Sequence, residues 1–483
     1  MRGGVSRGRT ALLGLDVGTT TVKALLVAPD GEPLGLHVAP YPAERASDQP
    51  EEWWEAVLRA VRGLDVASRR VDIAAVGVCG RGSGLALLDR RRDPIPAPWA
   101  RVRARAAALG LPATRRFRRV AQWGRLLRAL AQESPAASAA VVLGPPREGL
   151  RRAPVDGSHG HGSGRRGVPR VAAPTRALGC RPRSAPADPT AGIEARGACP
   201  RAARTLGLPA GVPVAVGTHD GVAANVGAGM LRAGEGCVTL GTNAVLRMNT
   251  TGPVDGRWTA VPFTYPLGGG GYTSGGDVPE AGATMAWLVR TVGAPAPVVS
   301  RLSGPGRRDR TSAGRFFTFQ ARLDDLAAAV PAGAEGLGFL PDVGRGASLV
   351  GLRPGHGPGH LARAIMEGTA FALGDVLEAL VRRGQPVRAL RLTGGGSRSR
   401  VWTEIVAAIL ARPIGLVRPE ASARGAAVLA AVVAGVWPDV MMTATRRMVV
   451  AVGQVTPDPA ARRRYGRLRA GWVWACFGVA RSS

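Results

Sequence analysis

Residues 12–27 read LLGLDVGTTTVKALLV, two apolar runs joined by a short polar turn. Apolar runs on both sides of a Gly-Thr turn predict a β-hairpin. The tip presents one carboxylate, Asp16, one glycine, Gly18, and the hydroxyls of Thr19 and Thr20. Backbone amides and short hydroxyls at such a tip suit a phosphate, and a carboxylate suits the cation that accompanies it. The stretch alone fits an ordinary hairpin with a polar turn equally well, so both interpretations stay open here.

A second stretch repeats this pattern about 220 residues later. Residues 236–247 read GCVTLGTNAVLR, again two apolar runs around a Gly-Thr tip, here Gly241, Thr242 and Asn243. Two hairpins of one kind suggest two related domains that each offer a phosphate-binding tip. Chance similarity is the alternative, because Gly-Thr turns are common.

A carboxylate lies between the two hairpins in the sequence, at the end of an expected strand. Residues 212–216 are apolar, GTHDG follows, and residues 222–230 form a small-residue helix. Asp220 therefore ends a strand and precedes a helix, where a carboxylate could take a proton from a reacting hydroxyl. The alternative is a helix cap, a role that Asp favours. Lys23, on the return strand of the first hairpin, is interpreted as a solvated strand residue.

A triple-glycine loop in the second half is a further candidate binding element. Residues 387–393 predict a strand, and Gly394, Gly395, Gly396 and Ser397 lead into a helix over residues 401–410. Bare glycine backbone at a helix start can approach a flat base or a ribose closely. A flexible strand-to-helix turn is the alternative. The small-residue helix over residues 422–434 is expected to pack beside this loop.

Length and composition indicate a globular α/β protein. The chain has 483 residues and 45% hydrophobic residues, enough for two or more domains. The sequence contains no run of 18 or more apolar residues, so no membrane span is expected. The first apolar run holds Asp16 and Lys23, which argues against a signal peptide. A cytoplasmic location is therefore expected. The five cysteines form no CxxC pair and predict neither a zinc site nor a disulfide framework.

The formal charge of +30 raises nucleic acid as an alternative partner. However, Lys23 is the only lysine, and the arginine excess accompanies the alanine, glycine and proline bias of a GC-rich genome. Nucleic acid is therefore not the expected partner. Much of the excess lies in residues 101–203, which show little periodicity and contain a low-complexity tract with His159 and His161. This region is interpreted as a disordered insertion or an altered reading frame, and the two histidines as surface residues rather than metal ligands.

Six stretches in order resemble the FGGY carbohydrate kinase family, in particular its xylulokinase-like sugar and polyol kinases. They are DVGTTTVKALLV, DQPEEWWEA, GTHDGVAANVGAG, CVTLGTNAVL, HLARAIMEGTAFAL and LRLTGGGSRSRVW. The resemblance implies an α/β fold of two ribonuclease-H-like domains, of the actin and hexokinase type, around a nucleotide cleft. It places an N-terminal domain at residues 10–248, a C-terminal domain with the adenosine loop at 249–445, and a C-terminal extension at 446–483.

The resemblance also implies ATP-dependent, Mg²⁺-assisted phosphorylation of a hydroxyl on a small-molecule sugar or polyol, with a pentulose such as xylulose as one candidate. No membrane partner is implied, and a homodimer is left open. The implied roles are: general base, Asp220; metal, Asp16; ATP phosphates, Gly18, Thr19, Thr20, Gly241, Thr242 and Asn243; adenosine, Gly394, Gly395, Gly396 and Ser397; sugar, Arg81, Gly82, Ser83 and His219.

The chain departs from the family pattern on the sugar side. Arg81-Gly82-Ser83 stands where xylulokinase-like members carry a Gln-Met-His loop. Arg101 replaces the acid of the family's Trp-x-Asp-x-Arg motif, so a hydrogen-bond acceptor becomes a donor. Residues 342–346 replace the family's Ser-Gly-Glu-Arg loop. The alternative function is therefore a non-catalytic nucleotide-binding relative with a degraded substrate side.

Overall fold

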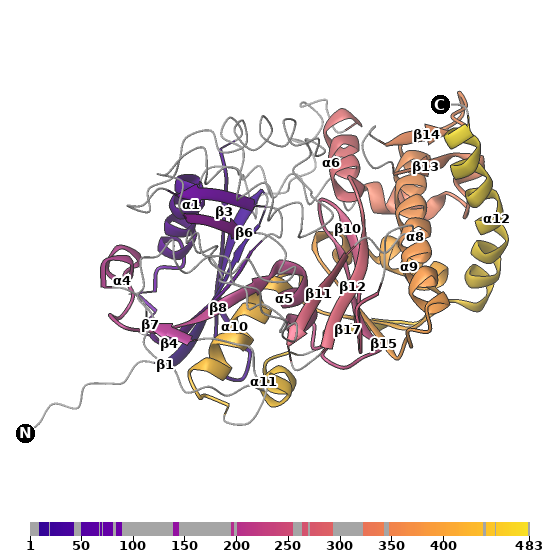
Figure 1. Ribbon diagram of the computed structural model, residues 1–483. Coiled ribbons are helices and arrows are strands. Elements are labelled where there is room, and N and C mark those ends of the chain that lie inside the picture. Colours follow the sequence, from indigo (N-terminus) through magenta and orange to yellow (C-terminus); the bar gives the residue numbers. More distant parts are fainter. Residues whose placement is uncertain are drawn as a thin grey trace, which may run out of the picture. The chain divides into compact units, whose positions relative to one another are not determined.

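A computed structural model of the chain forms two compact units (Figure 1). It describes residues 9–18, 20–42, 50–66, 68–69, 71–80, 84–88, 139–143, 195–197, 200–254, 263–268, 271–292, 322–341, 347–437, 441–449 and 451–481. Unit 1 comprises Met1–Gly229, Tyr265–Gly270 and Glu420–Val450, and unit 2 comprises Met230–Thr264, Gly271–Pro419 and Ala451–Ser483. The domain boundaries expected from the sequence stay predictions.

Unit 1 is built on a mixed sheet with the strand order β3-β2-β1-β4-β8-β7. Its strands are β1 Arg9–Val17, β2 Thr21–Val27, β3 Pro33–Pro40, β4 Val71–Gly80, β7 Ala195–Gly197 and β8 Pro213–His219. Strands β1 and β2 pair antiparallel with Leu12 opposite Val27, which confirms the first predicted hairpin. Strands β1, β4 and β8 run parallel, so Asp16, Gly80 and His219 lie together at the carboxyl-terminal ends of these strands.

Side-chain alternation along β1 assigns the two faces of this sheet. Leu13 and Leu15 belong to the apolar core that also contains Val57 and Val61 of helix α1 (Pro50–Arg62). Because side chains alternate along a strand, Gly14 and Asp16 point to the opposite face. Helix α10 (Ala421–Val433) packs against β1 and β4, and against helix α5 (Asp220–Gly227). Asp16 therefore lies on the face that α10 covers.

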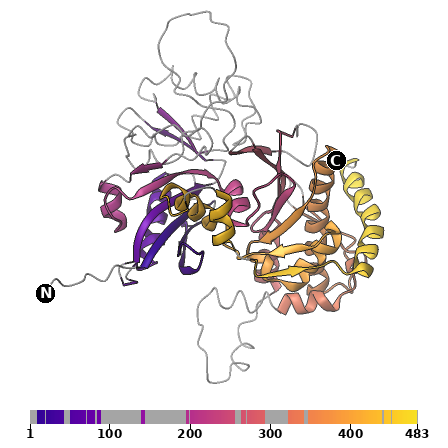
Figure 2. The ribbon, with the colours of Figure 1, turned by 90° about the horizontal axis from the view of Figure 1, so that it is seen from below.

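Helix α10 approaches the sheet of unit 1 so closely that glycines are required beneath it (Figure 2). A Cβ at Gly14 would lie 1.9 Å from the carbonyl oxygen of Ala423, and a Cβ at Gly77 would lie 1.8 Å from that of Ala426. Arg424 donates to the carbonyl oxygen of Gly31 at 2.8 Å and fixes the helix to the β2–β3 turn. That this helix can also pack beside the triple-glycine loop stays a prediction.

Unit 2 is built on a second mixed sheet, with the strand order β11-β12-β10-β9-β15-β16-β17. Its strands are β9 Glu235–Leu240, β10 Ala244–Thr250, β11 Phe263–Gly268, β12 Gly271–Val278, β15 Ala389–Thr393, β16 Ile414–Leu416 and β17 Gly453–Val455. Strands β9 and β10 pair antiparallel, with Ala244 opposite Leu240, so the second predicted hairpin is also confirmed. Strand β15 runs parallel to β9.

Helices cover the face of the unit 2 sheet on which Leu240 and Leu246 lie, and together they form the core of the unit. They are α6 Ala281–Val292, a helix over residues 322–329, α8 Pro358–Arg382, α9 Arg400–Leu410 and α12 Pro459–Arg481. The C-terminal helix α12 contacts α8 and α9 (Figures 1 and 2) and buries Tyr465 and Trp472 in this core. Sequence analysis assigned no element to this segment.

A buried hydrogen-bond network ties α12 to α8. Glu367, 4% exposed, accepts from Nε of Arg363 at 2.8 Å, from the Tyr465 hydroxyl at 2.7 Å and from the backbone amide of Gly333 at 3.1 Å. Burial raises the pKa of Glu367, although these donors oppose the shift. The network fixes the C-terminal helix to the rest of unit 2 with satisfied polar groups.

The shorter elements complete the described chain. They are β5 Gly84–Leu88, β6 Ala139–Leu143, α4 Pro200–Leu206, η3 Ala334–Gly336, β13 Gly338–Leu340, β14 Ser348–Val350, η4 Gly395–Arg398 and α11 Met441–Met448. Among the helices in the described ranges, none has the length and apolar character needed to cross a membrane.

Candidate active site

Asp16 is a buried carboxylate at the end of β1. It is 5% exposed, and its Oδ2 lies 3.3 Å from Nζ of Lys23, its cross-strand neighbour in the hairpin. Burial raises the pKa of Asp16, and Lys23 opposes that shift. Burial also disfavours the charged form of Lys23, but Asp16 outweighs this effect and raises the pKa of Lys23. Lys23 is thus a strand residue whose side chain is 37% exposed, and the interpretation as a solvated residue did not include its ion pair with Asp16.

The tip of the first hairpin is braced from the neighbouring strand. The amide of Gly18 donates to the carbonyl oxygen of Thr21 at 3.0 Å, which closes the turn. The amide of Tyr41 donates to the carbonyl oxygen of Thr20 at 3.0 Å, and the Tyr41 hydroxyl donates to that of Gly18 at 3.3 Å. Thr20 is exposed, so its hydroxyl is available at the tip. Thr19 lies outside the described residues.

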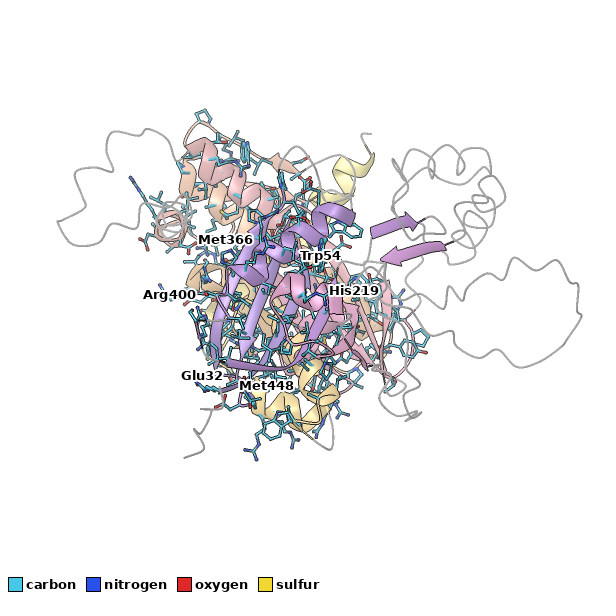
Figure 3. The ribbon with its side chains drawn as sticks, turned by 90° about the vertical axis from the view of Figure 1, so that its left-hand side faces the viewer. Glu32, Trp54, His219, Met366, Arg400 and Met448 are labelled. Atoms are coloured by element: carbon cyan, nitrogen blue, oxygen red, sulfur yellow. The ribbon has the colours of Figure 1, made fainter. Side chains whose placement is uncertain are left out.

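His219, which is labelled in Figure 3, caps helix α5. Asp220 does not, so the alternative role considered for Asp220 was wrong. Nδ1 of His219 accepts the amide of Gly221 at 2.9 Å. Asp220 is the first residue of the helix, and its side chain is 32% exposed. The charge of Asp220 acts on Asp16 and contributes to the raised pKa of Asp16, so unit 1 brings these two carboxylates into one electrostatic environment.

The proposed sugar-side loop lies outside the described residues. This applies to Arg81, Gly82 and Ser83, which follow directly after β4. Arg101 of the family motif, the residues 342–346 and the two histidines His159 and His161 also lie outside them. The sugar contacts predicted for these positions stay predictions.

In unit 2 the second hairpin tip is joined to the start of α6. The amide of Gly241 donates to the carbonyl oxygen of Asn243 at 3.0 Å and closes the turn. The amide of Ala283 donates to the carbonyl oxygen of Thr242 at 3.1 Å, and the amide of Glu280 donates to Oδ1 of Asn243 at 3.0 Å. The side chain of Thr242 is exposed, so this tip also presents a hydroxyl.

The triple-glycine loop lies directly against this second hairpin. Gly394 has a φ of +96°, and a Cβ there would lie 2.4 Å from the carbonyl oxygen of Leu240, the last residue of β9. A Cβ at Gly396 would meet Cβ of Leu240 at 2.8 Å and the indole of Trp402 at 3.2 Å. Ser399 follows the loop and caps α9 by accepting the amide of Trp402 at 3.0 Å. Unit 2 therefore brings together the predicted phosphate tip and the predicted adenosine loop.

The donor set around Asp16 fits a magnesium ion that arrives with phosphates. Magnesium prefers hard oxygen ligands and is usually held by one or two carboxylates together with substrate phosphates and water. Asp16 supplies a buried carboxylate, Lys23 offsets part of its charge through Oδ2, and the charge of Asp220 adds to the negative field. A carboxylate whose pKa is raised by burial gains most from a cation, so Asp16 is the residue that would hold the metal.

Three supporting residues escaped the sequence analysis. Tyr41 braces the first hairpin, Tyr265 stacks on His219 with ring centroids 4.1 Å apart, and Trp402 underlies the glycine loop. Tyr41 and Tyr265 lie outside the stretches that carry a motif, whereas Trp402 ends the stretch LRLTGGGSRSRVW but was assigned no role. The ion pair of Lys23 could have been found, because the predicted hairpin register places Lys23 directly opposite Asp16.

The two units, each with a Gly-Thr hairpin beside parallel strands, define an actin- and hexokinase-like kinase fold. The N-terminal domain model of the FGGY family of carbohydrate kinases matches residues 11–108, and the C-terminal domain model matches residues 236–434. The chain belongs to the FGGY family of carbohydrate kinases, which use ATP. The predicted fold class and family are confirmed.

Curated relatives differ in substrate and in the extent of the match. The xylulose kinase of Escherichia coli is 27% identical over 423 residues, 82% of this chain and 84% of that protein. A glycerol kinase of Saccharopolyspora erythraea is 34% identical over 48% of this chain, and a gluconokinase of Bacillus licheniformis is 28% identical over 44%. The matches span 45% and 40% of those two proteins, less than half of each.

Solved structures agree on the fold over nearly the whole chain. A ligand-bound xylulose kinase from Lactobacillus acidophilus superposes with a TM-score of 0.72 at 19% identity, covering 98% of both chains. A xylulose kinase from Rhodospirillum rubrum gives a TM-score of 0.65 at 25% identity, with 98% and 99% of the two chains covered.

Proposed function

We propose that this protein is an ATP-dependent phosphotransferase that phosphorylates a hydroxyl of a small sugar or polyol. The observation that carries the proposal is the pair of interacting carboxylates, buried Asp16 and partly exposed Asp220, together with the exposed Thr20 at the tip of the first hairpin. Phosphoryl transfer needs little covalent chemistry from the protein and depends on positioning and charge stabilisation. Asp16 as a metal ligand, Asp220 as a proton acceptor and the two hairpin tips as hydrogen-bond donors would together suit that task.

Each unit supplies a different part of the reaction. In unit 2, Thr242 and Asn243 would donate to the phosphates, and residues Gly394–Ser397 would hold the adenosine. In unit 1, Gly18, Thr19 and Thr20 would bind the transferring phosphate, and Asp16 would hold Mg²⁺, which supplies charge neutralisation for the phosphate oxygens. Asp220 would accept the proton of the attacking hydroxyl as general base.

The substrate class proposed is a neutral pentulose, xylulose being the first candidate. Support comes from the xylulose kinase of Escherichia coli, whose match spans most of both chains, in contrast to the partial matches with gluconokinase and glycerol kinase. His219 and the Arg81-Gly82-Ser83 loop are the proposed sugar contacts. A cytoplasmic location accords with an ATP-dependent reaction and stays part of the proposal.

The variant Asp220→Asn tests the assignment of the base. It keeps the size of the side chain but cannot take a proton, so kcat should fall by roughly 10²–10⁴-fold while the Kd of ATP stays unchanged. The matched control is Asp72→Asn, an exposed carboxylate elsewhere on β4, which should behave as wild type. Near-normal turnover of Asp220→Asn would show that another group is the base.

A further inference from the structure

Nδ1 of His219 has two neighbours that make opposite demands on it. The amide of Gly221, 2.9 Å away, can only donate, so it needs an unprotonated nitrogen. Oδ1 of Asp220, 3.1 Å away, can only accept when ionised, so it needs a protonated nitrogen. A ring nitrogen carries either a proton or a lone pair in the ring plane, so His219 can satisfy one of these partners at a time.

The helix favours the first partner. Gly221 is buried, as are all the residues that follow it in α5, so water has little access to its amide. A buried amide without an acceptor loses its hydration without compensation, so loss of the cap bond is strongly unfavourable. Asp220 is 32% exposed and can exchange a protein donor for water at little cost.

The ring is held in this position by its surroundings. Its side chain is 11% exposed, and it stacks on Tyr265 with an interplanar angle of 25°. His219 also ends β8 opposite Gly80 of β4, so its backbone is fixed by the sheet. Besides His219, the charged and titratable groups that interact with Asp220 within the described ranges include Asp16 on β1, Lys23 on β2 and Cys79 on β4.

We propose that His219 is a positioning residue for Asp220. Its neutral imidazole carries the proton on Nε2, caps α5 through Nδ1 and gives the Asp220 carboxylate no hydrogen bond, so that this carboxylate remains able to accept a proton. A proton on Nδ1 would exchange the cap bond for a hydrogen bond to Asp220, which becomes an ion pair when Nε2 is protonated as well, and would make that carboxylate a weaker base. The inference deepens the proposed function, because it needs Asp220 as the base.

The tautomer can be measured without any turnover. Two-bond ¹H–¹⁵N correlation spectra of the full chain distinguish the protonated from the unprotonated nitrogen of each of its six histidines. The variant His219→Asn removes one signal and so assigns it. At neutral pH we expect the proton of His219 on Nε2. A proton on Nδ1 at that pH would overturn the proposal.

A pair of substitutions separates positioning from packing. In His219→Asn the side-chain oxygen can still accept the Gly221 amide, whereas His219→Leu fills space but cannot cap. His219→Leu should lower kcat by about 100-fold, as expected for a misplaced catalytic group, with the KM of ATP unchanged. His219→Asn should recover part of this loss. Equal activity of the two variants, or wild-type kcat in His219→Leu, would contradict the proposal.

The pH profile provides a readout that packing alone would not move. A carboxamide cannot take up the proton that an imidazole binds, and imidazoles bind protons at higher pH than carboxylates. The acidic limb of kcat/KM should therefore shift to lower pH in His219→Asn, and an unchanged limb would overturn the proposal. If the wild type phosphorylates no carbohydrate, the proposed function fails, whereas the spectra still decide the tautomer.

Discussion

At the scale of single residues, the burial of Asp16 makes the stability of unit 1 depend on pH. Burial raises the pKa of Asp16 above its value in the unfolded chain, so the folded state binds this proton more tightly than the unfolded state does. The contribution of Asp16 to stability is therefore complete at low pH and is lost as the pH rises through the folded pKa. The raised pKa of Lys23 acts in the alkaline range and leaves this argument unchanged.

The variant Asp16→Asn tests this direction of the pH dependence of stability. It removes the cost of ionising a buried carboxyl, and Lys23, which is 37% exposed, can be solvated instead. Asp16→Asn should unfold at the same temperature as wild type at low pH and at a higher temperature at neutral pH, while kinase activity is lost. Thermal unfolding followed by circular dichroism across pH 3–8 measures the difference, with Asp72→Asn as the control. A difference that shrinks as the pH rises would contradict the assignment of a raised pKa.

Local sequence motifs predicted some site residues and missed those that depend on contacts between distant segments. The hairpin tips and the triple-glycine loop were predictable because their turn chemistry is local. Tyr265 was not, because its contact with His219 joins residues from two separate segments and depends on how the strands are ordered. The register of β1 with β2 did contain the pairing of Asp16 with Lys23, which sequence analysis overlooked.

At the scale of elements, the close approach of α10 to β4 makes Gly77 a sensitive position. A Cβ there would meet the Ala426 carbonyl oxygen at 1.8 Å, so Gly77→Ala should destabilise the fold by about 1–3 kcal/mol through overpacking. The matched control is Gly466→Ala in α12, where a Cβ meets nothing within 4 Å and a better helix former should stabilise by about 0.5–1 kcal/mol. Urea unfolding compares both with wild type.

Wild-type stability of Gly77→Ala would show that α10 does not pack on β4 as described. The sequence predicted helix α10 but not its packing on β1 and β4, because runs of alanine and glycine indicate a close approach without identifying the element approached. Helix α12 was overlooked in an arginine-rich segment. The spacing of Tyr465, Leu468 and Trp472, three and four residues apart, places them on one helical face and could have revealed it.

At the scale of the whole molecule, the two units share one kind of hairpin but differ in the other candidate site residues that they contain. Unit 1 holds the acidic groups Asp16 and Asp220, whereas unit 2 holds the glycine loop against β9. The fold class and family could be predicted because six motifs recur in a fixed order. The sugar could not, because hairpins and glycine loops contact the nucleotide, and Arg101 and the Arg81-Gly82-Ser83 loop depart from the family pattern.

The most direct test of the central claim is the transfer reaction itself. Release of ADP is measured with purified full-length protein, Mg²⁺ and ATP over a panel of pentuloses, hexuloses and polyols, with ³¹P NMR to identify the phosphorylated product. We expect carbohydrate-dependent ADP release with at least one pentulose, together with a sugar phosphate that does not form with Asp220→Asn. Binding of ATP without turnover of any carbohydrate would contradict the claim and favour a non-catalytic nucleotide-binding protein.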